Sequence, residues 1–319
     1  MQGRALGRFF ARRLIGMLLT LLVTSFLVFG SLYLAPGSPI AFLIGHHQAS
    51  AREIAQVRAQ YHLNESFFSR YWDWLTAILH GHFGNSIVYG QSVGSLLGPR
   101  VLTTVLLVAY ASVLALGLGI ALGIAGALGG RIVDRAVLIT TSVGVAIPSF
   151  VAAIVLLYVF AVQLDWFPSF GAGSGLPDRL WHLTLPAISL ALGSVALLTR
   201  FTRAAVREEL RSEHVETAVT RGLPRGTVFR RHVLRNSLIP ITASGGIVIA
   251  TMIVAVAVVE KAFALDGLGA YLIDAVDAND FPVVQAIALL FATAYVVLNT
   301  VIDLIYAAVD PRVAAATAR

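Results

Sequence analysis

Few side chains in this sequence could carry out metal chemistry. There is no cysteine, which excludes disulfides, zinc thiolate sites, iron–sulfur clusters and cysteine nucleophiles. The histidines closest together are His46-His47 and His80 with His82, and no His-Glu-x-x-His pattern accompanies them. Solvated loop histidines are the common case, so we predict no metal site.

Hydrolytic chemistry is equally poorly supported. Ser194 and Ser244 lie in apolar runs, but no histidine lies inside any of these runs to act as their base. Lys261 is the only lysine, and no Gly-x-x-x-x-Gly-Lys-Ser/Thr phosphate loop surrounds it. We therefore expect no catalytic residue, no ATP site and no cofactor bound by this chain.

The composition indicates that lipid surrounds most of the chain. Of the 319 residues, 57% are hydrophobic and only 13% are charged, and the mean hydropathy is +0.81. A soluble domain carries roughly 25% charged residues. A chain this apolar cannot cover its surface with polar groups in water, so we predict an all-α polytopic membrane protein.

The basic balance does not indicate nucleic acid. The net charge is +6, and nearly all cations are arginines that lie between apolar runs. No DNA- or RNA-binding motif accompanies them, and basic loops beside membrane spans are typical of cytoplasmic loops.

Six stretches are long and apolar enough to cross a hydrocarbon core, which needs about 20 helical residues. The first has no small-residue cleavage site, so we expect it to be retained, not removed as a signal peptide. The predicted spans are approximately 14–35, 101–127, 136–163, 183–203, 236–259 and 281–305. They give an N-terminal part (1–99, one span and a large external loop), a core (100–309) and a tail (310–319).

Six spans place both termini on one side. That side, with the segments after the second and fourth spans, carries 17 of the 23 lysines and arginines. Positive residues accumulate in cytoplasmic loops, so we expect both termini and the segment 204–235 to be cytoplasmic.

Several residues inside the spans could shape or move them. Gly119 and Gly123 form a small-xxx-small pair that would allow another helix to approach closely. Pro148, Pro186 and Pro240 each lack an amide donor, so each could mark a static kink or a hinge.

One acidic residue, Asp303, lies near the cytoplasmic end of the sixth span. It could be solvated at the interface, or it could pair with an arginine such as Arg200 or Arg203. No chain of ionisable groups crosses the spans, which argues against a proton relay and an ion-coupled carrier.

The segment 204–235 predicts a short helix between two longer ones. Val215, Ala218 and Val219 form a short apolar stripe beside Glu216, and the following Gly222-Leu223-Pro224-Arg225-Gly226 should end the helix. A new helical run then leads into the fifth span. The segment could be a plain connection, or a lever by which a soluble partner moves two spans together.

This segment also carries a resemblance. Glu216-Thr217-Ala218 followed by Gly222 resembles the Glu-Ala-Ala…Gly loop of ABC importer permeases, with Thr217 in place of the middle alanine. The resemblance extends over nearly the whole chain to the first permease subunit of dipeptide, oligopeptide and nickel importers. Other matching motifs are Gly81-His82-Phe83-Gly84 with Ser86 (where His82 replaces an acid), Ile147-Pro148-Ser149-Phe150, Leu185-Pro186-Ala187, Leu234-Arg235-Asn236, Gly267-Leu268-Gly269 and Asp280-Phe281-Pro282.

The resemblance implies a fold and a set of partners. The fold would be the type I ABC importer transmembrane fold in a bacterial inner membrane. The partners would be a second homologous permease, two ATPase subunits or domains that use ATP and Mg, and an external binding protein. The cargo would be di- or oligopeptides, with nickel chelates, glutathione or haem as alternatives.

It also implies roles for particular residues. The ATPase-coupling loop would comprise Glu216, Thr217, Ala218, Gly222, Leu223 and Arg225. Candidates for contact with the binding protein, or for an outer gate, are Glu260, Asp274, Asp277 and Asp280.

Overall fold

The computed structural model describes residues 2–34 and 65–309, and these are helical apart from short connections and an isolated bridge between Asn85 and Ser92. The helices of the first half are α1 (Gln2–Leu34), α4 (Phe67–Leu79), α5 (Val93–Leu128), α6 (Arg131–Ala146), α7 (Ser149–Leu156) with the π-helical turn η1 (Leu157–Gln163), and α8 (Leu176–His182). The expected tail 310–319 and the external-loop residues 35–64, which include His46-His47, lie outside the described residues.

The second half begins with α9, which has the most extensive contact with α5. Its helices are α9 (Thr184–Leu210), α10 (Glu213–Thr220), α11 (Arg225–Val228), the π-helical η2 (Phe229–Leu234), α12 (Arg235–Ala262), α13 (Leu268–Asp277) and α14 (Phe281–Val309). The run from α11 through η2 to α12 is continuous, as the sequence predicts for the entry into the fifth span.

Five of these helical segments are long and apolar enough to span a membrane, and a bent pair supplies a sixth. The five are Phe10–Ser31, Val93–Leu128, Thr184–Leu210, Arg225–Ala262 and Phe281–Leu304. The prediction of an all-helical, polytopic architecture is therefore confirmed.

The third span differs from the expected continuous helix 136–163. It consists of α6 and the α7–η1 segment, which are bent by 97° at their junction. Ile147 has φ −86° and ψ 116°, and Pro148 has φ −61° and ψ 143°, so both residues are extended. A proline disfavours helical geometry in the residue before it and offers no amide donor itself, so the helix stops and restarts. Pro148 thus marks a break, not a kink.

The other two prolines differ from each other. Pro186 lies in the first turn of α9, where an amide would have no helical acceptor, so it begins the helix and the expected kink there is wrong. Pro240 lies inside α12 and removes the amide that would bond to the Asn236 carbonyl.

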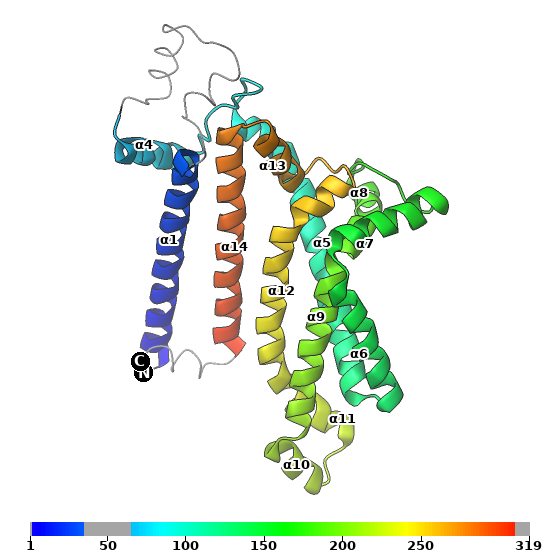
Figure 1. Cartoon of the computed structure of the whole chain (residues 1–319). Helices are drawn as coiled ribbons and strands as arrows, with labels where there is room; N and C mark the ends of the chain where they lie inside the picture. The colour runs from blue at the N-terminus through cyan, green and yellow to red at the C-terminus, as the bar shows by residue number, and fades with distance from the viewer. Residues whose placement is uncertain (1, 35–64, 310–319) are drawn as a thin grey trace, which may run out of the picture.

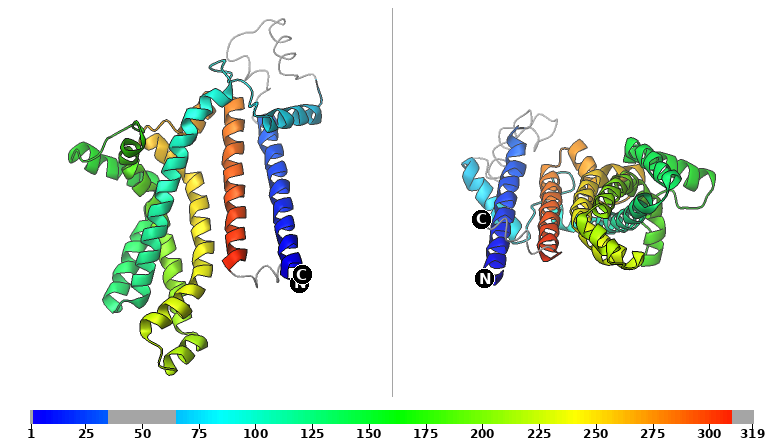
Figure 2. Two further views of the ribbon diagram at one scale, coloured as in Figure 1. Left: turned by 180° about the vertical axis from the view of Figure 1, so that it is seen from behind. Right: turned by 90° about the horizontal axis from the view of Figure 1, so that it is seen from below.

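The helices are arranged as a bundle with two outlying helices. Figure 1 shows α5, α6, α9 and α12 together, with α14 beside α12 and α1 outermost, and the view from below in Figure 2 shows the same order. The start of α1, the end of α14 and the helix α10 lie at one end of the molecule (Figure 1), which we call the α10 end. Helices α4 and α13 lie at the opposite end, which we call the α4 end.

The most extensive helix contact joins α5 to α9, and small residues bring the two helices close together. A Cβ atom on Gly119 would lie 2.9 Å from the Leu198 Cβ, and one on Gly123 would lie 2.5 Å from the Thr202 Cβ. Only glycine allows this approach, so the close helix contact predicted for these two glycines is confirmed.

At the α4 end, α4 crosses the end of α1. The Tyr71 hydroxyl lies 2.8 Å from the Ser25 hydroxyl, and Phe26 and Phe29 of α1 contact the Tyr71 ring with centroids 5.3 and 5.7 Å away. On the exposed part of α4, Trp72 has 55% of its surface accessible. This aromatic helix suits a membrane interface.

Candidate functional site

The short helix α10 connects two long helices at one end of the molecule. It lies between the end of α9 at Leu210 and the start of α11 at Arg225, so residues 211–224 form a compact projection (Figure 1). We call residues 211–224 the α10 segment. The short helix predicted from the sequence is present, with long helices on both sides.

One face of α10 is anchored in a local apolar core. Val215 and Ala218 are each 4% exposed, and they pack against side chains of α9, α11, η2 and α12. The buried members of this core are Val206, Val215, Ala218, Val228, Val233 and Ile241. Val219, expected in the same apolar stripe, points outward and is 57% exposed. Displacing α10 therefore requires moving the ends of both long helices.

The C-terminal end of α10 has a defined stop. The Gly222 amide donates to the Val219 carbonyl at 2.9 Å, and the Leu223 amide donates to the Ala218 carbonyl at 3.3 Å. Gly222 has φ +77°, and this pair of bonds with a left-handed residue is the Schellman motif. The helix stop predicted at Gly222 is confirmed, and Pro224 follows it.

Polar contacts brace the base of the projection. The Asn236 amide donates to the Glu209 carboxylate at 2.8 Å, and the His214 Nε2 lies 2.8 Å from the same carboxylate. Asn236 and the His214 ring are 3.1 Å apart. Sequence reasoning missed this group of three, although Asn236 stands in one of the motifs that carry the family resemblance.

The remaining surface of the α10 segment is open to a partner. Glu216, Thr217, Gly222 and Leu223 are exposed, and so is Arg225, the first residue of α11. Of the six residues expected to form a coupling loop, only Ala218 is buried, where it anchors the helix.

The expected partners of Asp303 are wrong. Asp303 pairs with Arg13 of α1 at 2.9 Å. Arg203 instead pairs with Asp134 of α6 through two contacts at 2.5 and 3.0 Å, and Arg207 reaches the same carboxylate at 3.0 Å. The reason is geometric: α14 lies beside α1, whereas α9 lies beside α6.

The third cation of that group, Arg200, also binds α6. Its Nη2 donates to the Ser142 hydroxyl at 2.8 Å. Together with the Asp134 pairs, this contact fixes α6 to the lower part of α9. Sequence reasoning missed Asp134, because its role depends on which helix lies beside α6.

At the α4 end, Glu260 is fully buried and caps a helix. Its Oε2 accepts the amides of Gly269 and Ala270 at 2.7 and 3.0 Å, and its Oε1 accepts the Thr104 hydroxyl at 2.6 Å. The Thr104 oxygen in turn accepts the Leu268 amide at 2.8 Å. The carboxylate thus satisfies the first turn of α13, whose partial positive charge favours it. In this conformation it cannot contact an external protein, which corrects that expectation.

Two glycines make room for this cap. A Cβ on Gly267 would lie 2.3 Å from the Glu260 carboxyl carbon, and one on Gly269 would lie 2.4 Å from the Ala257 Cα. The Gly267-Leu268-Gly269 motif is therefore explained by space at the α12–α13 junction, because neither residue has a positive φ.

Asp280 is a second buried acid, so its expected contact with a binding protein is also corrected. It is 2% exposed, it accepts the Ser86 hydroxyl, and it accepts the Ile87 amide at 3.1 Å. These bonds attach the loop after Gly81-His82-Phe83-Gly84 to the start of α14.

The other two acids expected to contact the binding protein are at the surface. Asp274 is exposed and pairs with Lys261, while Asp277 is exposed on the same helix. Nearby, Arg100 lies 4.2 Å over the ring of Tyr271 and pairs with Asp266 at 2.8 Å. Burial raises the pKa of Tyr271 above its ordinary value, so its phenol stays neutral beneath the arginine.

Within the described residues, no group of three or more acidic or histidine side chains could hold a metal ion. The features that the structure does assemble are apolar spanning helices, a short helix held between two of them, and two buried carboxylates at the opposite end. These define a multi-pass helical membrane protein.

The comparisons with known proteins identify the family. A family model described as "Binding-protein-dependent transport system inner membrane component" matches residues 115–315, and the corresponding N-terminal model matches residues 6–98. The chain belongs to this family of ABC importer permeases and has its type I importer fold. Members of this family are inner-membrane permeases, not enzymes, and they work with ATPase and binding-protein partners.

Curated relatives cover almost the whole chain. The chain is 35% identical over 303 residues to the glutathione transport system permease protein GsiC of Salmonella choleraesuis (strain SC-B67), covering 95% of this chain and 97% of the relative. It is 34% identical, with the same coverage, to GsiC of Escherichia coli (strain K12).

Proposed function

We propose that this chain forms half of a translocation path for short peptides across a bacterial inner membrane. The other half is a second, homologous permease subunit. An external binding protein delivers the peptide, and two separate ATPase subunits or domains supply the ATP and Mg chemistry. Both termini and the α10 segment face the cytoplasm, where the ATPases are.

The α10 segment carries this proposal. It presents an exposed face that includes Glu216 and Thr217, while Val215 and Ala218 fix its other face to the ends of α9 and α12. A partner that grips the exposed face therefore moves two spanning helices as a unit.

The mechanism is a change in population between two arrangements. ATP binding closes the ATPases, which shifts α10 and with it α9 and α12, and the path opens to the other side. A differential of a few kcal/mol between the two arrangements is sufficient, because ~5.5 kcal/mol moves a two-state equilibrium from 1:99 to 99:1. Pro148 and Pro240 are the candidate hinges, with the 97° break at Pro148 the most pronounced.

At the α4 end, the buried Glu260 and Asp280 act as outer-gate elements by fixing α13 and the start of α14. The exposed acids Asp274 and Asp277 are the candidate contacts for the binding protein.

The relatives favour glutathione as the first peptide to test. GsiC proteins are named for glutathione transport, and glutathione is a tripeptide. Uptake of labelled glutathione and of a labelled dipeptide by cells expressing the intact importer separates these cargoes, and nickel chelates or haem remain the alternatives if neither is taken up.

Replacement of Gly222 tests the coupling role. Gly222→Val places a β-branched residue at φ +77°, which costs ~1–2 kcal/mol and disrupts the Schellman stop. If this cost falls on the coupled arrangement of α10, it lowers the population of that arrangement roughly tenfold, and we expect ATP-driven uptake to fall by the same factor. Membrane insertion should be unchanged. The measurement is substrate uptake and ATP hydrolysis by the reconstituted importer.

Two control variants make the test specific. Gly222→Asn should retain most of the uptake, because asparagine tolerates the left-handed region. Gly226→Ala lies in helical α11 in open space and should match the wild type. Wild-type uptake in Gly222→Val would show that the α10 segment does not couple ATP hydrolysis to transport.

A further inference from the structure

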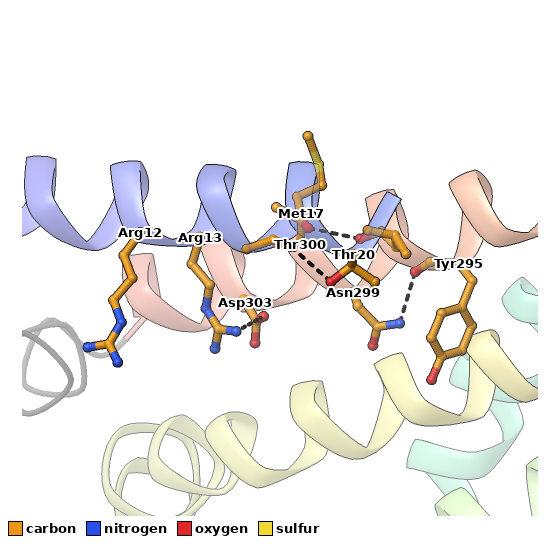
Figure 3. A pocket seen from close by; sticks show the side chains of 10 residues that line it. Arg12, Arg13, Met17, Thr20, Tyr295, Asn299, Thr300 and Asp303 are labelled. Carbon is orange, nitrogen blue, oxygen red and sulfur yellow. Dashed lines mark hydrogen bonds and ion pairs between the residues drawn. The ribbon is translucent and has the colours of Figure 1, made fainter. Parts of the chain in front are cut away.

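Two adjoining cavities lie between α1 and α14. The first, of about 530 Å³, lies between α1 and α14 at the α10 end, as Figure 3 shows. The second, of about 450 Å³, lies between α1, α12, α13 and α14. Both are lined by Thr20, Tyr295 and Val296, so they form one groove, which we call the α1 groove.

The two ends of the α1 groove differ in chemistry. At the α10 end, Arg12 and Arg13 project from α1. Asp303 is the only acid among the lining residues that the structure describes, so these residues carry a net charge of +1. Beyond Thr20 the lining is mostly apolar and includes Ile253, Val254, Ala257, Leu272, Phe291 and Ala292.

Three other polar side chains of the lining donate to carbonyls of their own helices. The Thr20 hydroxyl donates to the Gly16 carbonyl at 2.9 Å, and the Thr300 hydroxyl donates to the Val296 carbonyl at 2.8 Å. The Asn299 amide donates to the Tyr295 carbonyl at 2.9 Å, as the dashed lines in Figure 3 show. The groove is thus cationic at its mouth and largely apolar further in.

The length of the groove matches one membrane leaflet. Arg13 and Thr24 are separated by about 17 Å along α1 at ~1.5 Å per residue. Half of a hydrocarbon core is about 15 Å. The arginines at the mouth suit an anionic head group at the membrane surface. The apolar part, as long as one leaflet is deep, suits a single long chain of the same amphiphile.

We infer that the α1 groove binds an anionic phospholipid, with its phosphate at Arg12 and Arg13 and one acyl chain along α1 and α14. Basic pockets between spanning helices bind anionic head groups in this way. The lipid would join the outlying α1 to the rest of the bundle. The inference does not depend on which substrate is transported. It rests on the proposed function in one respect: if the α10 end is cytoplasmic, the lipid belongs to the cytoplasmic leaflet.

Photo-cross-linking to the intact importer tests the inference. The importer is placed in nanodiscs that contain a photoactivatable phosphatidylglycerol or, separately, a photoactivatable phosphatidylcholine. We expect phosphatidylglycerol to label peptides of α1 and α14, and phosphatidylcholine to label them much less. Equal labelling by the two probes would overturn the inference, because the arginines would then not select the head group.

Two variants locate the site. Arg12→Gln keeps the Arg13–Asp303 pair and should weaken phosphatidylglycerol labelling about fivefold, the effect of one arginine near an anionic lipid. Gly16→Leu fills the mouth from a position where a Cβ meets nothing within 4 Å, and it should abolish labelling without harming the helix. The matched controls are Arg131→Gln and Gly117→Leu, both on exposed positions outside the groove, and both should label like the wild type.

Three further results would contradict the inference. The first is unchanged labelling in both groove variants. The second is competition by soluble glycerol phosphate as strong as by the lipid, which would mean that the mouth binds a free phosphate. The third is cross-linking of a photoreactive residue at position 16 to the second permease subunit, which would mean that a protein helix fills the groove. In each case the uptake measurement on Gly222→Val would still stand by itself.

Discussion

At the scale of single residues, Glu260 illustrates how a buried acid can be structural. Its carboxylate completes the first turn of α13 and receives the Thr104 hydroxyl, so each of its oxygens accepts at least one hydrogen bond. Burying such a polar group is tolerated because the neighbouring donors form hydrogen bonds with both carboxylate oxygens. Gly267 belongs to the same unit, because its missing Cβ is the space that the carboxylate fills.

We therefore expect Gly267→Ala to destabilise the protein by about 2–4 kcal/mol. The new Cβ would lie 2.3 Å from the carboxyl group, so Glu260 must move and leave the amides of Gly269 and Ala270 without an acceptor. The measurement is thermal unfolding of the purified permease in detergent.

A double-mutant cycle separates this mechanism from a general effect of alanine. Glu260→Ala is destabilising by itself, but Gly267→Ala should cost little more in its background, because the clash is gone. Gly117→Ala, in open space inside α5, should be neutral or slightly stabilising. Additive effects of the two changes would show that Gly267 and Glu260 do not act together.

Residue roles were only partly predictable from the sequence. A glycine that ends a helix is a local feature, and Gly222 was predicted correctly for that reason. The partner of Asp303 depends on which helix lies beside α14, and nothing local to Asp303 distinguishes Arg13 from Arg200 or Arg203. The burial of Glu260 and Asp280 likewise depends on distant segments. The sequence therefore predicted surface acids, whereas Glu260 caps α13 and Asp280 anchors the loop at Ser86 and Ile87.

At the scale of elements, the contact between α6 and α9 rests on Asp134. Its carboxylate receives Arg203 and Arg207, and the Asp134 and Arg203 side chains are only 17% and 18% exposed. We expect Asp134→Asn to lower the stability of the protein, because Arg203 and Arg207 both lose their counter-charge. Thermal unfolding of the purified permease is again the measurement.

Matched substitutions test the role of charge. Asp134→Glu keeps the charge and should restore most of the stability, whereas Asp277→Asn at an exposed site should have no effect. If Asp134→Asn is as stable as the wild type, these ion pairs do not hold α6 against α9.

The elements show the same division between local and distant causes. Apolar runs of about 20 residues identify spanning helices well, because lipid leaves the backbone no other partner. The break between α6 and α7 was underestimated, since Pro148 by itself permits a kink or a break. Whether Pro148 kinks or breaks the helix depends on how the segment after it packs. The pattern of apolar residues in the third run carries no information about that packing.

At the scale of the whole molecule, the arrangement of the spans follows from connections and small residues. Short loops make neighbours of consecutive helices, and Gly119 and Gly123 select α9 as the close partner of α5. The separate position of α1 and α14, and hence the groove between them, could not be predicted, because the helices that meet there come from opposite ends of the sequence.

Orientation is the property of the whole molecule on which the proposed function depends most. The arginine distribution predicts that the α10 end is cytoplasmic, because a positive loop is costly to translocate. The chain has no cysteine, so a single introduced cysteine reports on one position without a background. Thr217→Cys on exposed α10 and Gln91→Cys on the exposed loop before α5 lie at opposite ends.

A membrane-impermeant maleimide should therefore label Gln91→Cys, and not Thr217→Cys, in intact spheroplasts. In inverted membrane vesicles the pattern should reverse, and detergent should allow both positions to react. The detergent sample is the control that each cysteine is accessible in the folded protein. Labelling of Thr217→Cys in sealed spheroplasts would place α10 on the side without ATP, and no cytoplasmic ATPase could then act on α9 and α12 through this helix.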